Sequence, residues 1–297
     1  MKFCDLMTFS VVAKCMNITA AAKQLNTVQS NVTSRIHALE EHLGLPLFER
    51  HSRGVSLTRA GERFLPYAYK VLSIINEASI VARDEGEACG ILTIGSMETT
   101  LASRLPETLT LFHKKYPLIN IKMEAGTTAD LIDKVLNSDL DGAFIAGPLD
   151  HPLILANKFC DEELILVTHP FFKSIASIKN MENNITALVL KEGCAYRQRL
   201  EQFLTSIGRP TYQRMEFGSL DGIMGCVRAG LGITLLPKSI VERSDFKEGY
   251  AMHEIDHVIA NVSTLFIRRK DSYESTALKL FMNSFTMSWH RTDQHQF

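Results

Sequence analysis

The stretch that decides the fold of the N-terminal region is Thr19–Phe48, TAAAKQLNTVQSNVTSRIHALEEHLGLPLF. Its first part predicts a short helix from about Ala20 to Leu25, with Thr19 as the N-cap, because threonine caps helices well and alanine favours them. Residues 26–28 then predict a break. The second part predicts a helix from about Gln29 to His42. The sequence therefore indicates two helices joined by a turn too short to let them separate.

The second helix carries one apolar stripe, whose members recur at steps of four, three and four: Val32, Ile36, Leu39 and Leu43. If this stripe faces a core, the opposite face is polar. Such a face suits the major groove, where glutamine pairs with adenine, arginine with guanine, and serine or threonine with either. The candidate DNA contacts on this helix are Gln29, Ser30, Thr33, Ser34, Arg35 and His37. An ordinary solvated face of a three-helix core would show the same pattern, so the helix alone leaves both interpretations open.

The segments on either side add a third helix and a wing. Apolar residues at helical spacing predict a helix over Phe3–Met16, which completes a small bundle. After Leu45, two short extended pieces around Gly54 predict a β-hairpin. Flexible guanidinium groups beside a groove-reading helix can hold phosphates or enter the minor groove, although solvated surface arginines are the alternative. The candidate phosphate contacts are Arg50, Arg53 and Arg59.

A long helix is predicted next, from Arg59 to about Glu87, with Thr58 as its N-cap. Its apolar residues repeat at threes and fours and form a seam that a single small domain could not cover. The same helix of a second subunit is the expected partner. A homodimer would carry two reading helices and would fit a dyad-symmetric operator.

From Ile91 onward, strands alternate with helices, which predicts a parallel, right-handed α/β sheet. Two such sets, joined by crossing strands, predict two lobes with a cleft at the strand ends. The chain is therefore divided into a winged helix-turn-helix domain (1–58), a linker helix (59–89) and a two-lobed domain (90–297). Lobe I is expected to span 90–160 and 266–297, and lobe II 161–265.

Charge and composition limit the function classes. The net charge is −1, but residues 1–63 hold eight basic against five acidic residues, so this end carries +3 and the remainder −4. A basic end on an acidic body fits phosphate contact confined to one end. No apolar run approaches 18 residues and the start lacks a secretory pattern, so we expect a cytoplasmic protein without a membrane partner. The cysteines and histidines form no CxxC or HExxH motif, and no metal or cofactor is expected.

Four runs carry a likeness to a known family: TAAAKQL (19–25), QSNVTSRIHALEEHLGLPLFER (29–50), LTRAGERF (57–64) and GLGITLLP (230–237). The first three resemble the N-terminal domain of LysR-type transcriptional regulators, and the last resembles a signature of their effector domain. The resemblance implies a winged helix-turn-helix, a linker helix and a periplasmic-binding-protein-like effector domain. It also implies a homodimer or homotetramer that binds double-stranded operator DNA, responds to a small-molecule effector and works with RNA polymerase.

The same resemblance assigns residues. Gln29, Thr33 and Arg35 match positions that commonly meet DNA, and the three arginines Arg50, Arg53 and Arg59 match wing and linker positions near phosphates. Many members have Ser or Thr where this chain has Val28, and Pro where it has Ser30. Thr27 is therefore an alternative cap for the reading helix.

The resemblance places the effector cleft at loops around residues 95–100, 126–128, 147–148, 193–197 and 218–219. Free backbone N–H groups at helix N-termini favour a carboxylate, which Arg197 would strengthen. Glu98 leaves room for a zwitterionic or partly cationic effector, and the hydroxyls would otherwise serve only as N-caps. The candidate effector contacts are Ser96, Met97, Thr99, Thr100, Thr127, Thr128, Cys194, Arg197, Gly218 and Ser219.

Three other functions compete with an effector-modulated DNA-binding regulator. The thiol of Cys194, at a helix N-terminus beside an arginine, predicts a lowered pKa and reaction with oxidants, hence a redox-responsive regulator without a ligand. An enzyme in the α/β part would need a recognisable nucleophile or phosphate loop, and we find no GxSxG, Walker or GxGxxG motif. A solute-binding module would need an export signal. We therefore expect a regulator and not an enzyme.

Overall fold

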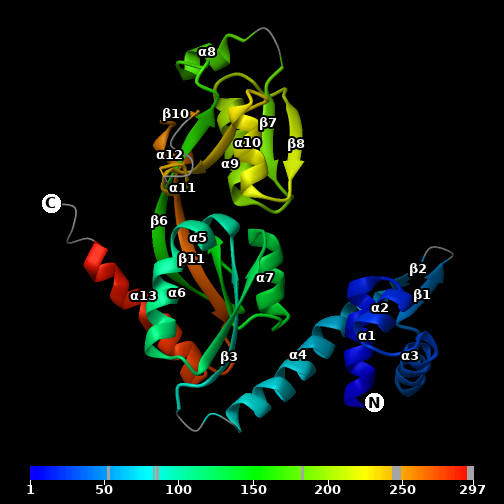
Figure 1. The fold of residues 1–297 in the computed structure, drawn as a ribbon. Helices are drawn as coiled ribbons and strands as arrows, with labels where there is room; N and C mark the ends of the chain where they lie inside the picture. The colour runs from blue at the N-terminus through cyan, green and yellow to red at the C-terminus, as the bar shows by residue number, and fades with distance from the viewer. Residues whose placement is uncertain (52–53, 83, 85–86, 182–183, 243–248, 293–297) are drawn as a thin grey trace. The chain divides into compact units, whose positions relative to one another are not determined.

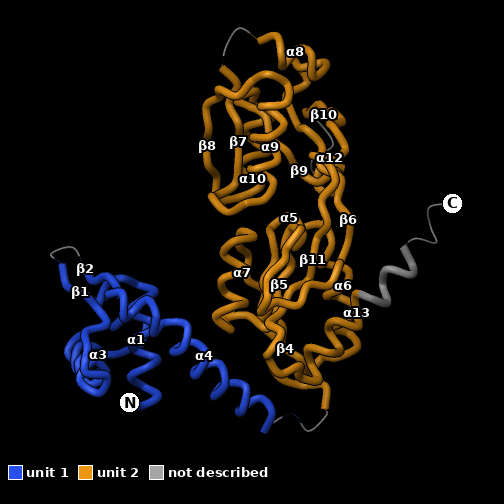
Figure 2. The backbone as a smooth tube through the Cα atoms, turned by 180° about the vertical axis from the view of Figure 1, so that it is seen from behind, with its two compact units in different colours: residues 1–85 blue, residues 86–297 orange. Residues whose placement is uncertain are grey.

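The fold was taken from a computed structural model, which describes residues 1–51, 54–82, 84, 87–181, 184–242 and 249–292, with side chains as far as Phe285. The chain divides into two compact units, Met1–Glu85 and Gly86–Phe297 (Figure 2). Buried apolar clusters lie within each of them. Each unit therefore has a core of its own. None of the helices in the described ranges is long and apolar enough to span a membrane.

The first unit begins with a three-helix bundle: α1 (Phe3–Cys15), α2 (Ile18–Gln24) and α3 (Gln29–Leu43). The predicted apolar stripe of α3 faces inward, since Val32, Ile36 and Leu39 are buried. They pack with residues such as Phe9 and Leu47. The predicted helix pair is confirmed, and the opposite face of α3 is left outside the core.

The caps of α2 and α3 differ from the prediction. Asn17, not Thr19, caps α2, because its side chain accepts a hydrogen bond from the Ala20 N–H at 2.9 Å. Val28 occupies the N-cap position of α3, and its apolar side chain cannot accept a hydrogen bond. Thr27 does not cap α3 either, since it lies one residue too early and its Oγ1 accepts a bond from Asn31 instead, at 2.8 Å.

The predicted wing is an antiparallel hairpin of β1 (Phe48–His51) and β2 (Gly54–Leu57). The Glu40 carboxylate of α3 accepts hydrogen bonds from the N–H groups of Leu47, at 2.7 Å, and Phe48, at 3.1 Å. The hairpin is thereby tied to α3 through its first strand.

Helix α4 (Arg59–Val81) follows, capped as predicted by Thr58, whose Oγ1 accepts a bond from the Gly61 N–H at 3.0 Å. It ends at Val81 instead of near Glu87, because the apolar repeat that defines it stops at that point. Its apolar side chains are exposed within this unit, among them Tyr67, Val71, Ile74, Ile75 and Val81. The predicted seam is wrong in its first half, because Phe64, Leu65, Ala68 and Leu72 pack against the bundle core of this unit. The exposed apolar side chains of α4 need a partner outside the unit.

The second unit has two lobes (Figure 1). Lobe I is built on three parallel strands, with Phe144 of β5 facing α6 and α13 and its neighbours Ala143 and Ile145 facing α7. A short helix over Glu98–Ser103, which was not predicted, precedes the helix over Leu105–Lys115 and takes in part of the expected loop at 95–100. The elements of lobe I are β3 (Gly90–Ser96), α5 (Glu98–Ser103), α6 (Leu105–Lys115), β4 (Ile119–Ala125), α7 (Thr128–Leu136), β5 (Gly142–Ala146) and α13 (Thr276–Thr292).

Lobe II repeats the α/β pattern around the parallel pair β7 and β8. The helices α8, α11 and α12 are only four or five residues long and were not predicted. The elements of lobe II are α8 (Ile175–Lys179), β7 (Thr186–Leu190), α9 (Ala195–Ser206), β8 (Gln213–Phe217), α10 (Leu220–Arg228), β9 (Thr234–Pro237), α11 (Lys238–Val241), β10 (Ala251–His253) and α12 (His257–Ala260).

Two antiparallel strands, β6 (Ile154–Thr168) and β11 (Asn261–Arg269), run through both lobes. The sheet order is β10-β6-β11-β5-β3-β4, with β9 paired to β6. The predicted parallel sheet is confirmed for β3, β4 and β5. The strands β6 and β11 pair antiparallel because the chain crosses to the second lobe and returns. Residues 154–168 form one strand, with a register shift opposite Thr264 and Leu265.

Candidate functional sites

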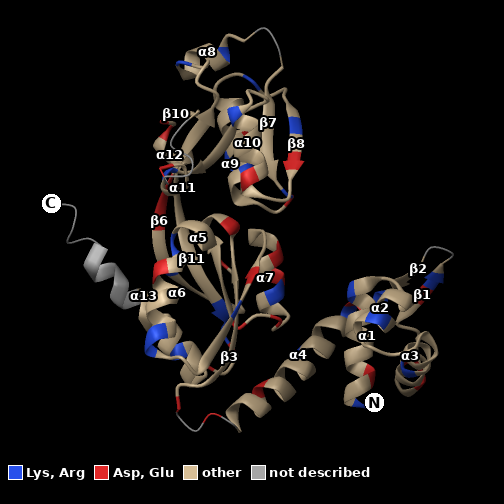
Figure 3. Ribbon diagram, in the orientation of Figure 1, with Lys and Arg blue, Asp and Glu red and all other residues tan. Residues whose placement is uncertain are grey.

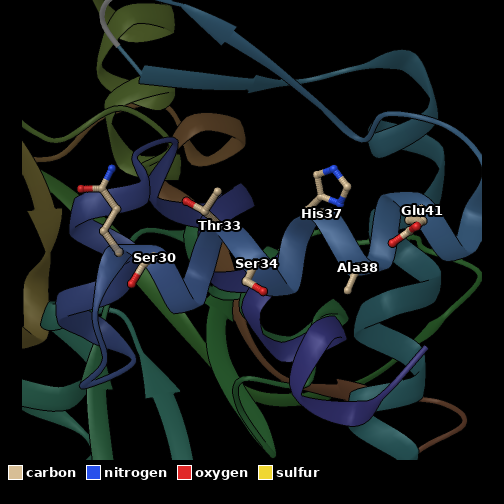
Figure 4. A pocket seen from close by; sticks show the side chains of 7 residues that line it. Ser30, Thr33, Ser34, His37, Ala38 and Glu41 are labelled. Atoms are coloured by element: carbon tan, nitrogen blue, oxygen red, sulfur yellow. The ribbon is translucent and has the colours of Figure 1, made fainter.

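The outer face of α3 forms a shallow hollow of small and polar side chains (Figure 4). Figure 4 shows Ser30, Thr33, Ser34 and His37 projecting along the length of the helix. The lining residues are Gln29, Ser30, Thr33, Ser34, His37, Ala38 and Glu41. Five of the six candidates predicted on this helix are therefore brought together, whereas Arg35 is outside this lining.

Hydrogen bonds hold the side chains on both flanks of α3. On one flank, the Thr19 hydroxyl donates to Gln29 Oε1 at 3.4 Å. On the other, Arg35 Nε donates to Asn31 Oδ1 at 3.1 Å, and Asn31 Nδ2 donates to Thr27 Oγ1 at 2.8 Å. The row of Thr27, Asn31 and Arg35 was not predicted from the sequence, although its spacing of four residues could have revealed it.

The wing and the start of α4 supply cations. Arg50 is exposed on β1, opposite Val55, and Arg59 is exposed at the first position of α4. Arg53 lies outside the described residues. Figure 3 marks further Lys and Arg positions on α2 and α3. Basic side chains thus occur on the same unit as the polar face of α3.

In the second unit, several predicted effector contacts act as caps or are buried. Thr127 Oγ1 accepts a bond from Asp130 N at 3.2 Å, and Ser219 Oγ accepts one from Gly222 N at 3.3 Å, so both are N-caps. Ser96, Met97, Thr99 and Thr100 are buried. Thr128 Oγ1 lies 3.7 Å from Met97 Sδ, and a Cβ added at Gly218 would meet nothing within 4 Å. The alternative interpretation, that these hydroxyls serve as N-caps, is confirmed for Thr127 and Ser219.

Two hydrogen bonds join the lobes. Glu98 Oε1, on α5 of lobe I, accepts a hydrogen bond from the Leu220 N–H, at the start of α10 in lobe II, at 3.0 Å. A second bond between the lobes runs from the Ala129 N–H to the Gly193 carbonyl, at 3.4 Å. A carboxylate of the chain itself therefore occupies the positive end of α10.

Two buried hydroxyls face this region from opposite lobes. Thr99 Oγ1 and Tyr196 OH have no hydrogen-bond partner among the described residues, and Thr99 is only 2% exposed. Burial raises the pKa of the Tyr196 phenol, and the neighbouring Thr99 hydroxyl opposes that rise as a hydrogen-bond partner would. The two hydroxyls therefore lie close together but outside good hydrogen-bond geometry. Buried polar groups usually find partners, so these atoms can receive a polar ligand.

Two predictions about lobe II are corrected. Burial raises the pKa of the Cys194 thiol, and the backbone N–H groups and positive charge of Arg197 offset this only in part. The expected lowered pKa is therefore wrong. Arg197 is only 11% exposed in its side chain and pairs with Glu201 at 3.3 Å and Glu216 at 3.1 Å. It is already neutralised within lobe II.

A buried ion pair joins the lobes at the crossing strands. Glu162 of β6 is 4% exposed and accepts two hydrogen bonds from Arg104, from Nε at 2.7 Å and Nη2 at 2.9 Å. Ser239 of α11 donates a third at 3.1 Å. The hydrogen bond between Arg104 and Glu162 raises the pKa of the Arg104 guanidinium. The residues lie 58 and 77 positions apart, so no local pattern could have predicted the cluster.

Comparisons with known proteins agree with this architecture. The family model described as "Bacterial regulatory helix-turn-helix protein, lysR family" matches residues 3–62, and "LysR substrate binding domain" matches residues 85–289. The HTH-type transcriptional regulators YusT and GltR of Bacillus subtilis are each 42% identical to this chain. The YusT match covers 95% of this chain and 94% of that protein, and the GltR match covers 93% of each.

Solved structures show the same fold. A full-length variant of OxyR from Pseudomonas aeruginosa is 23% identical with a TM-score of 0.68, covering 97% of this chain and 95% of that one. Full-length CbnR complexed with its target DNA is 24% identical with a TM-score of 0.65, covering 97% and 100%. The matched families and the relatives in Bacillus subtilis are described as transcriptional regulators and not as enzymes, as predicted. The two family matches together span nearly all of the sequence, and the chain therefore belongs to the LysR family of DNA-binding, effector-responsive transcriptional regulators.

Proposed function

We propose that α3 reads the operator from the major groove through the side chains of its outer hollow, Gln29, Ser30, Thr33, Ser34 and His37. Arg50, Arg53 and Arg59 hold phosphates beside it. The hollow carries the proposal, because five candidates chosen by angle or by resemblance line one continuous face. In this assignment, residues 1–58 form the DNA-binding domain, 59–89 the linker helix and 90–297 the effector domain.

A pair of substitutions separates base reading from phosphate contact. Gln29→Ala is expected to lower affinity for a selected operator by about 1–3 kcal/mol and to relax preference at one base pair. Arg50→Ala is expected to weaken binding to every duplex and to reduce the slope of log K against log salt by about 1. Fluorescence anisotropy on operator and random duplexes at several salt concentrations measures both. Equal losses on both duplexes for Gln29→Ala would contradict base reading.

The effector is inferred to be a small molecule with a carboxylate, which replaces Glu98 at the N-terminus of α10. Three observations support this inference. The position already holds a carboxylate, Thr99 follows Glu98 in the chain and its buried hydroxyl lies close to that of Tyr196 in lobe II, and Arg197 is paired elsewhere. A ligand at the N-terminus of α10 would replace the hydrogen bond between Glu98 and Leu220 with contacts of its own, and would thereby change the packing of the two lobes against each other.

Glu98→Gln tests the exchange. Removing the internal carboxylate is expected to strengthen binding of small carboxylic acids by up to roughly tenfold, since an anion at a helix N-terminus contributes about 0.3–2 kcal/mol. Thermal shift of the full chain with a panel of carboxylates, and with the matching amides as controls, measures the effect. Tighter binding of amines than of carboxylates, or weaker carboxylate binding by the variant, would contradict the proposal.

The chain is further inferred to act as a homodimer or homotetramer in the cytoplasm, with RNA polymerase as a protein partner. The exposed apolar side chains of α4 support self-association, because a surface of this kind is costly to leave in water. Two copies would present two α3 helices to one operator.

A further inference from the structure

A row of three polar side chains runs along one flank of α3. Asn31 and Arg35 lie four residues apart on α3, one above the other, and Thr27 lies just before the N-cap, four residues ahead of Asn31. Asn31 lies in the middle and bonds to both neighbours, to Thr27 at 2.8 Å and to Arg35 at 3.1 Å. Both Asn31 and Arg35 are half-buried. The Arg35 side chain is therefore held in place before any DNA is present.

The chemistry of the groups fixes the direction of these bonds. A guanidinium Nε can only donate, so the atom of Asn31 that faces it is the carbonyl oxygen. The amide nitrogen of Asn31 then faces the Thr27 hydroxyl. Since Nε is occupied, the four N–H donors on the two terminal nitrogens of Arg35 remain as a planar fork that matches a phosphate or carboxylate.

The position of Arg35 decides what this fork meets. At 100° per residue, Arg35 lies a quarter turn beyond Ser34, which is on the outer face. Arg35 is also outside the described lining of the hollow. If α3 enters a major groove as proposed above, a side chain at this flank meets the groove wall, where the duplex presents phosphates.

We propose that Asn31 is a positioning residue, which holds Arg35 against one operator phosphate and so sets the depth and register of α3 in the groove. Holding the guanidinium in advance reduces the freedom that it loses on binding. This inference rests on the proposed entry of α3 into the groove, and it adds Asn31 and Thr27 to the residues that determine operator binding.

A double-mutant cycle tests the role of Asn31. Arg35→Ala is expected to weaken binding to a selected operator about tenfold and to lower the salt slope by about 1. Asn31→Ala is expected to weaken it about threefold with the salt slope unchanged, since the cation remains. In the Arg35→Ala background, Asn31→Ala is expected to have no further effect. Alanine favours helix more than asparagine, so the variant is expected to fold, and circular dichroism checks this.

Asn31→Asp gives a second readout that a structural role would not move. Aspartate keeps an acceptor for Arg35 and for the Thr27 hydroxyl, so a merely structural role predicts wild-type affinity. A positioning role predicts a larger loss than that of Asn31→Ala, because the carboxylate neutralises the guanidinium and repels the phosphate. Wild-type affinity for Asn31→Asp would overturn the proposal, as would an Asn31→Ala effect that persists in full without Arg35.

A set of operators with one neutral methylphosphonate each locates the phosphate. One position is expected to weaken the wild type about tenfold and to leave Arg35→Ala unaffected. If no position behaves in this way, the single-phosphate contact is wrong. A failure of the proposed function can be told apart from a failure of this inference. If α3 did not enter the groove, Gln29→Ala and Arg35→Ala would both bind with wild-type affinity. Loss of the Asn31 effect alone would leave the Gln29→Ala result intact.

Discussion

Arg104→Met is expected to lower the free energy of unfolding of the effector unit by about 3–5 kcal/mol, because it leaves the Glu162 carboxylate buried with Ser239 as its remaining described side-chain partner at normal hydrogen-bond distance. Methionine fills a similar volume, so a cavity contributes little. Urea unfolding of the full chain, followed by circular dichroism, measures the change. A loss below about 1 kcal/mol would show that the ion pair is not a principal link between the lobes.

Glu162→Gln provides the matched control for this first variant. It leaves Arg104 without its carboxylate, but the Arg104 side chain is 38% exposed and water can solvate it. We therefore expect a smaller loss, about 1–2 kcal/mol. If Glu162→Gln were the more damaging of the two, burial of an unpaired carboxylate could not be the main cost.

Ile74→Asp is expected to convert the proposed homodimer into a monomer and to lower operator affinity at least roughly a hundredfold. The side chain is 54% exposed within its own unit, so the charge should disturb the subunit contact and not the fold. Loss of one subunit removes the second half-site contact, whose effective concentration is worth about 10²–10⁴ in affinity. Light scattering coupled to size exclusion and anisotropy with a selected operator measure the two effects.

Asn76→Asp is the control on the same helix. It adds the same charge two residues away, about 200° around α4 from Ile74, at an exposed position. We expect a dimer with operator affinity within about threefold of wild type, a difference of roughly 0.7 kcal/mol. If Ile74→Asp stayed dimeric, or if Asn76→Asp became monomeric, the face of α4 that carries Ile74 would not be the specific subunit contact.

The sequence predicted those features that depend on local periodicity. The stripe of Val32, Ile36 and Leu39 set the outer face of α3 without any structure, because the angle between residues on a helix is fixed. The cap at Thr58 was also predictable. The caps of α2 and α3 were not predictable. The helix α2 begins one residue before Thr19, with Asn17 as its cap, and Val28 occupies the cap position of α3 without a side-chain hydrogen bond.

Features that depend on residues distant in the chain could not be predicted in this way. Hydrophobic patterns of β6 and β11 reveal strands but not their antiparallel direction. Arg197 was expected to face the cleft from its own loop, but Glu216 of β8 attracts it within lobe II. The prediction for Cys194 considered only nearby charge and expected a lowered pKa, whereas burial in the structure raises the pKa of the thiol. The base and phosphate contacts of α3 and the wing stay predictions.

The bonds from Glu40 to the N–H groups of Leu47 and Phe48 have a consequence for the DNA. They join α3 to the first strand of the wing, so the spacing between the two is set by the protein. A duplex that meets both must match that spacing, and a groove that is too narrow or too wide must deform. Because deformation energy depends on base sequence, we expect base pairs that no side chain touches to contribute to operator choice.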